Sequence, residues 1–197
     1  MRWMWIDRIL EFEPGERAVS IKAVSLSEEH LHDHLPACPR RGLHTLPVMP
    51  ASLVIEGMAQ TAGILVGCTL AFREKVVLAK VSLAELLTDA LPGDTIRHET
   101  MIERLDETGA STRGIVKIIR PTKTGAETIP LGRIDLMFAF VDRNRAGLRF
   151  PEHNFVLTEA FLTLLRTSGF PVPDPKLDEA SRNLVIPQRL PRHHVAP

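Results

Sequence analysis

A chain of 197 residues, 44% of them hydrophobic, is long enough to bury one sizeable core, which favours one domain with an appendage over two full domains. Basic and acidic side chains number 24 each, so the formal net charge is zero. This balance argues against a nucleic-acid-binding protein and against a polybasic membrane anchor, so any charged partner must be bound by a local patch.

The two cysteines, Cys38 and Cys68, have neither the spacing of metal ligands nor the density of a secreted disulfide scaffold. We therefore interpret them as free thiols in a reducing compartment and expect a cytoplasmic protein. The first residues include Asp7 and run into a charged segment, unlike the apolar core of a signal peptide, so no export is expected.

Alternation of apolar and polar residues at period two predicts a strand around residues 19–22, directly after a turn at residues 13–16. The same pattern predicts four later strands. Short turns separate the last three, which are therefore expected to form an antiparallel meander. The four later strands are predicted at residues 76–83, 95–105, 112–120 and 129–141.

Residues 53–72 form the most apolar stretch and are long enough for a membrane span. Glu56 and Gln60, one helical turn apart, argue against a span, as do three glycines within the stretch and the strands that follow it. We predict instead a central helix enclosed by the fold. The expected class is α+β, with an antiparallel sheet wrapped around this helix and extended across a homodimer at an unpaired edge.

The chain changes character near residue 142. We expect a folded domain at residues 1–142 and an extension at residues 143–197. Within the extension, residues 159–167 are predicted to form a short helix. Residues 170–197, rich in proline and polar residues, are predicted to be an arm or tail without a chemical role.

The most informative stretch is residues 30–60, which contains three motifs: His34-Leu35-Pro36, Pro47-Val48-Met49-Pro50 and Glu56-Gly57-Met58-Ala59-Gln60. Together they resemble the active-site region of the 3-hydroxyacyl-(acyl-carrier-protein) dehydratases of fatty-acid synthesis. Segments at residues 7–15 and 91–94 also resemble that family, so the resemblance covers residues 5–141. It implies a hotdog fold, the name given to a sheet wrapped around a central helix.

The resemblance implies that His34 and Glu56 are the catalytic pair, contributed by different subunits, and that the acyl chain enters a tunnel at the dimer interface. Dehydration needs a base for the proton beside the carbonyl and an acid for the departing hydroxyl. Histidine titrates near neutrality, and a carboxyl among apolar groups holds its proton more readily. The Ala51 N–H, after Pro50 at the helix start, can polarise the carbonyl. Gln60 is expected to orient the acid or to be a satisfied core amide.

The chain departs from the family by an insertion at residues 37–46, which lengthens the interval between histidine and acid by about eight residues, at little cost in loop-closure entropy. His34 can therefore keep its place, and His44 is the substitute base if the loop displaces it. Arg40 and Arg41 in the insertion are candidate contacts for a phosphate or a carrier protein, or ordinary solvated charges.

His30, His32 and His34 alternate, which on a strand would place all three on one face, as in a zinc site. Three neutral ligands from one strand rarely complete a tetrahedral shell. We therefore prefer a solvated histidine-rich edge, and we expect neither a metal nor a cofactor.

The sequence thus predicts an enzyme that dehydrates a 3-hydroxyacyl thioester, carried by acyl carrier protein or coenzyme A, to the trans-2-enoyl thioester. No nucleic acid and no membrane is expected as a partner. Two alternatives stay open. One is a hotdog thioesterase in which Glu56 activates water or attacks the carbonyl, and the other is a non-catalytic acyl-binding or assembly subunit.

Overall fold

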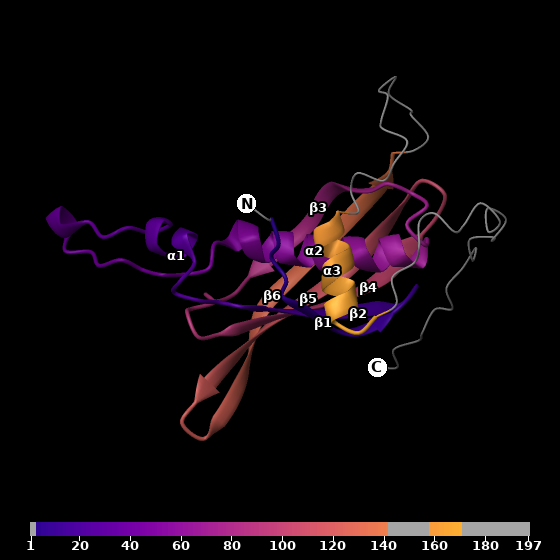
Figure 1. Ribbon diagram of the computed structural model, residues 1–197. Helices are drawn as coiled ribbons and strands as arrows, with labels where there is room; N and C mark the ends of the chain where they lie inside the picture. The colour runs from indigo at the N-terminus through magenta and orange to yellow at the C-terminus, as the bar shows by residue number, and fades with distance from the viewer. Residues whose placement is uncertain (1–2, 142–157, 171–197) are drawn as a thin grey trace, which may run out of the picture.

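The computed structural model describes residues 3–141 and 158–170, where a sheet of six antiparallel strands curls around one long helix (Figure 1). The strands lie in the order β1-β2-β4-β5-β6-β3, and the central helix is α2 (Ala51–Thr69). The other elements are β1 (Arg8–Glu13), β2 (Arg17–Ala23), α1 (Glu29–Asp33), the 3-10 helix η1 (Pro39–Arg41), β3 (Val76–Leu86), β4 (Thr95–Leu105), β5 (Gly109–Thr122), β6 (Gly125–Phe140) and α3 (Glu159–Thr167).

Helix α2 is the core of the domain. By length and composition it could cross a membrane, but 61% of its apolar window is buried inside the fold. The concave face of the sheet packs on it through fully buried residues such as Ile96, Val116 and Ile134. The predicted central helix is therefore confirmed, and its apolar character is explained by burial on several sides.

Strand β4 shows how the sheet acquires an inner and an outer face. Ile96, Thr100 and Ile102 alternate toward α2, as the period-two pattern predicted. Between them, Arg97 points outward and forms ion pairs with Glu99 at 2.9 Å and with a glutamate of β1 at 2.7 Å. A charged outer face leaves only the inner face for the core.

The meander is present as predicted and is longer than predicted. Strand β4 has the expected bounds, and β5 and β6 pair, with one register shift at Val116, to the end of their hairpin at Thr122 and Gly125. This hairpin projects beyond the rest of the sheet (Figure 1). Strand β1 was not predicted, because its residues were assigned only to the opening motif of the family.

Strand β3 lies at one edge of the sheet and pairs only with β6 within the described part of the chain. Leu78 and Val81 on this strand are exposed. The predicted short helix is present as α3 and packs near β1. Most of the expected arm, residues 171–197, lies outside the described residues.

Candidate active site

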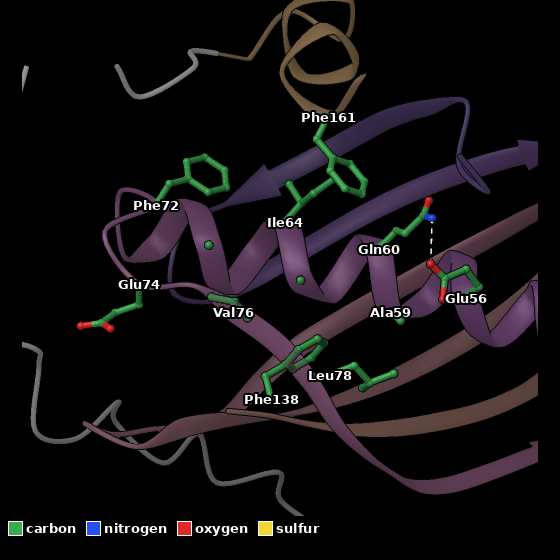
Figure 2. Close-up of a pocket in the computed structure, with 12 residues that line it drawn as sticks. Glu56, Ala59, Gln60, Ile64, Phe72, Glu74, Val76, Leu78, Phe138 and Phe161 are labelled. Atoms are coloured by element: carbon green, nitrogen blue, oxygen red, sulfur yellow. Dashed lines mark hydrogen bonds between the residues drawn. The ribbon is translucent and has the colours of Figure 1, made fainter. Parts of the chain in front are cut away.

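Glu56 lies on α2, half-buried, at one end of an apolar groove (Figure 2). One turn further on, Gln60 donates a hydrogen bond from Nε2 to Oε1 of Glu56 at 2.9 Å. Among the described residues, Oε2 of Glu56 has no hydrogen-bond partner. One carboxyl oxygen is thus held in place, and the other remains available for a group bound in the groove.

The N-terminal segment fixes the orientation of the Gln60 side chain. The Trp5 N–H donates to Gln60 Oε1 at 2.8 Å, and Gln60 Nε2 also donates to the Trp3 carbonyl at 3.0 Å. A backbone N–H can only donate, so the amide oxygen must face Trp5 and the amide nitrogen must face Glu56. Both the oxygen and the nitrogen of the Gln60 amide therefore have hydrogen-bond partners, and Glu56 is one of the two acceptors of the nitrogen.

The groove has a volume of about 220 Å³ and runs along α2 from Glu56 toward the end of the helix. Small residues on one face of α2 leave room for it, and aromatic and aliphatic side chains from β3, β6 and α3 form its walls (Figure 2). An apolar groove with a carboxyl at one end suits a linear apolar group whose polar end lies beside that carboxyl. The lining residues are Glu56, Ala59, Gln60, Gly63, Ile64, Gly67, Phe72, Glu74, Val76, Leu78, Phe138 and Phe161.

His34 directly follows helix α1, so the three histidines lie on a helical segment and do not share the one face that they would share on a strand. On a helix, His30 and His34 share a face one turn apart, and the His34 N–H donates to the His30 carbonyl at 3.1 Å. His32 points elsewhere and bonds the Leu26 carbonyl at 2.6 Å. Among the described residues, no three His, Cys, Asp or Glu side chains are grouped to hold a metal ion.

The inserted loop bulges away from the domain without separating its own ends. The Leu46 N–H donates to the Leu35 carbonyl at 3.1 Å, and Cys38 and Leu43 form an isolated bridge inside the loop. Leu31 of α1 is fully buried in the core, which anchors the segment just before His34. The insertion therefore projects outward and leaves the end of α1 tied to the domain.

Three candidates from the insertion lie on its surface. Arg40 and Arg41 are exposed on η1, and His44 is exposed in the loop beyond it. Neither His34, which is also exposed, nor His44 lines the groove at Glu56. Within the described part of a single chain, no histidine lines the groove that contains Glu56.

The start of α2 presents a free backbone donor. Pro50 precedes the helix in an extended conformation, and the Ala51 N–H has no acceptor among the described residues. The Met49 N–H donates to the Ala90 carbonyl at 2.9 Å, which fixes the helix start against the neighbouring turn. Ala51 is also one of the residues that line a second hollow, of about 230 Å³.

Sequence reasoning missed His98, which lies fully buried on β4 directly beneath α2. A Cβ placed on Gly57 would come within 2.7 Å of the His98 ring, so the residue after Glu56 is a glycine because the helix approaches this ring closely. Alternation along β4 predicts that residue 98 faces inward, and that was the available signal. The contacts of Trp3 and Trp5 with Gln60 had no such signal, because they join residues more than fifty positions apart.

Cys68 lies on α2 and Cys38 in the insertion, and both are free thiols. Burial raises the pKa of the Cys68 thiol to about 12, so this side chain stays protonated and has the character of a small apolar residue.

Comparisons with known proteins agree with this geometry. A family model described as a FabA-like domain matches residues 2–118. The 3-hydroxyacyl-(acyl-carrier-protein) dehydratase FabZ of Pelotomaculum thermopropionicum is 32% identical over 126 residues, which cover 64% of this chain and 84% of that protein. The protein of the same name from Roseiflexus castenholzii is 33% identical over 142 residues, covering 70% and 85%.

Among solved structures, the dehydratase heterocomplex ApeI:P from Xenorhabdus doucetiae contains a similar chain, with a TM-score of 0.52 and 14% identity, covering 70% of this chain and 83% of that one. At this identity the likeness concerns the fold. Together with the antiparallel sheet around α2, it confirms the predicted hotdog fold.

Proposed function

The chain belongs to the FabA-like family, and we propose that it removes water from a 3-hydroxyacyl thioester to give the trans-2-enoyl thioester in fatty-acid synthesis. The observation that carries this proposal is the Glu56 carboxyl, held by Gln60 at one end of an apolar groove. The names of the relatives at the sequence level point to the same hydro-lyase reaction and to a thioester of acyl carrier protein.

Glu56 acts as the acid. When the bond between C3 and its hydroxyl breaks, the oxygen leaves as water and takes the proton from the Glu56 carboxyl. Gln60 Nε2 donates to Oε1 before and after this transfer, so it also stabilises the carboxylate that remains. Oε2, which has no partner among the described residues, is the oxygen that carries the proton.

His34 acts as the base and takes the proton from C2, so that the electron pair of that C–H bond forms the new double bond. Proton exchange with water then restores both side chains. His34 is exposed and does not line the groove of its own chain, which supports its reaching the Glu56 groove of a second subunit. The unpaired edge and exposed apolar side chains of β3 support pairing of two chains as a homodimer.

Ala51 supplies the donor for the thioester oxygen, on which negative charge develops after loss of the C2 proton. Its N–H lacks an acceptor in the described structure and points from the positive end of the α2 dipole. Pro50 supports this role because its extended conformation ends the preceding segment at the helix start.

The insertion serves carrier binding. Arg40 and Arg41 are exposed cations on η1, close in sequence to the base, and they suit the phosphate of the pantetheine arm or an acidic carrier surface. His44 is a surface residue of the same loop without a catalytic role, because the hydrogen bond at the base of the loop leaves His34 anchored. The free thiols support a cytoplasmic location.

The purified protein is tested with 3-hydroxybutyryl and longer 3-hydroxyacyl thioesters on both carriers, following the absorbance of the conjugated enoyl product. We expect turnover that falls about 10²- to 10⁴-fold in His34→Ala and in Glu56→Gln and is retained in the matched control His44→Ala. Absence of enoyl product from every substrate would refute the proposal, and release of free thiol instead would identify a thioesterase.

Co-expression of His34→Ala with Glu56→Gln tests whether two subunits share a site. A mixed dimer has one site with both groups intact only if histidine and glutamate come from different chains. Recovered turnover in the mixture, relative to either variant alone, is the expected result. Continued inactivity of a verified mixed dimer would place both groups in the same chain.

A further inference from the structure

Helix α3 contributes a residue to the groove from outside the stretch that the family model covers. Phe161 lies on α3, points toward Ile64 of α2 and lines the groove in its far half (Figure 2). Ile64 follows Glu56 by eight residues, about 12 Å along the helix. The Phe161 ring therefore forms a wall of the groove about 12 Å along the helix from Glu56.

Phe161 belongs to a helix that is fixed to the domain. Leu165 on the same helix is fully buried in a cluster with Ile9 and Ile64, and the Ile9 N–H donates to the Ser168 hydroxyl at 3.0 Å. Phe170 packs on Phe12 with ring centroids 5.7 Å apart. A side chain held by such contacts keeps its position when an apolar chain presses on it.

The groove is also narrowed behind this wall. The Phe72 ring lies so close to Gly67 that a Cβ there would approach within 2.7 Å. Phe72 and the residue before it have positive φ, 54° and 50°, so the backbone turns sharply after α2 and brings this ring back onto the helix. Two phenylalanines, one from the domain and one from α3, thus bound the far part of the groove.

We propose that Phe161 sets the longest acyl chain that this protein accepts, by narrowing the groove at Ile64. The inference rests on the proposed function, because it concerns the acyl chain of the same substrate. Chains that end before the ring gain apolar contact with it, and longer chains must displace α3 or leave their ends in water. The substrate class is therefore a 3-hydroxyacyl thioester of medium chain length.

The test compares kcat/KM for 3-hydroxybutyryl, 3-hydroxydecanoyl and 3-hydroxyhexadecanoyl thioesters in the full-length wild type and its variants. Phe161→Ala should raise the ratio of hexadecanoyl to decanoyl turnover about ten-fold or more. Phe161→Trp should lower decanoyl turnover and spare butyryl turnover. Thr163→Ala, an exposed change on the same helix that removes nothing from the groove, should leave the ratio unchanged.

Unchanged ratios in both Phe161 variants, with turnover present, would overturn the inference and leave the dehydratase assignment standing. Absence of turnover in the wild type would overturn the proposed function instead. In that case the chain-length role of Phe161 is tested by ligand binding instead. The measurement is the increase in Tm caused by saturated acyl-pantetheines of the same three chain lengths. Phe161→Ala should then be stabilised more by the longest chain than the wild type is, and equal shifts would overturn the chain-length role.

Discussion

Gln60 holds Glu56 through a hydrogen bond of 2.9 Å between Nε2 and Oε1, and the backbone of the N-terminal segment holds Gln60 in turn. Trp3 accepts from the amide nitrogen, and Trp5 donates to the amide oxygen. The position of this carboxyl therefore depends on residues that precede the sheet. This chain of contacts explains how a carboxyl on an apolar helix is kept in one orientation.

The first prediction concerns Gln60→Met, which removes the donor to Glu56 while conserving side-chain length. A hydrogen bond to a charged group contributes about 1.5 kcal/mol, and loss of that amount from the transition state lowers kcat about ten-fold. KM should change little. In the Glu56→Gln background the same substitution should have almost no further effect on kcat, because the two residues act as a unit. An equal loss in both backgrounds would show a merely structural role.

The second prediction contrasts two glycines of α2. Gly57→Ala should lower the free energy of unfolding by about 1–3 kcal/mol, because its Cβ would lie 2.7 Å from the His98 ring and 2.9 Å from the Trp5 carbonyl. Gly63→Ala is the control, since its Cβ meets Phe138 at an ordinary 3.7 Å. It should leave stability unchanged or raise it by up to about 1 kcal/mol. Urea unfolding measures both, and equal stability of the two variants would contradict the close approach at Gly57.

The sequence predicted the parts of this fold that depend on local pattern. Alternation located β4 to the residue, and the apolar run with Glu56 and Gln60 located the enclosed helix. The candidate acid was identified by the resemblance of residues 56–60 to a family motif, and the cost of a carboxyl on an apolar helix supported that interpretation. The period of apolar residues and the spacing of polar ones are sufficient for such predictions when both partners lie on the same helix or strand.

Contacts between distant elements could not be predicted in this way. Three histidines in alternation fit a strand, but the segment is one short turn of helix, and so few residues do not distinguish the two periods. The place of Phe161 over Ile64 is set by packing between residues almost a hundred positions apart. The separation of His34 from the groove within one chain was likewise not evident from any local pattern.

The third prediction concerns the turn that anchors the start of α2. Asp94 has a side chain only 3% exposed and accepts two hydrogen bonds from Arg120, at 2.8 and 2.7 Å, and a third from the Leu91 N–H at 2.8 Å. Burial opposes ionisation of Asp94, but these donors outweigh it and lower its pKa. The contribution to stability is therefore present above the ordinary aspartate pKa and lost as pH falls below it.

Arg120→Met should accordingly lower the free energy of unfolding at neutral pH by about 2 kcal/mol, because it leaves a buried carboxylate with one remaining donor. Arg133→Met is the matched control, since Arg133 pairs with Asp135 on the surface and such pairs contribute about 0–1 kcal/mol. Denaturant unfolding at neutral pH distinguishes them. A loss in Arg133→Met as large as in Arg120→Met would contradict the special role of the buried carboxylate.

The fourth prediction concerns His98, the buried imidazole beneath Gly57. Burial lowers the pKa of His98 to about 4, and the backbone of Val54 opposes this only in part. In the unfolded chain, His98 has the ordinary histidine pKa of 6.5. Between about pH 4 and pH 6.5 the unfolded state therefore binds more protons than the folded state. Protonation of His98 therefore costs no stability above pH 6.5. As the pH falls from 6.5 toward 4, it lowers the free energy of unfolding by about 3 kcal/mol over the full window.

Urea unfolding of the wild type and of His98→Gln, each at neutral pH and at about pH 5, measures this contribution directly. The variant should be less stable at neutral pH, because the amide fills less of the space under α2, but it should lose less stability on acidification. Burial also lowers the pKa of His30, so the wild type contains a second group that acts in the same direction. The difference between the two proteins isolates His98, and equal acid losses would assign the pH dependence to His30 and other groups.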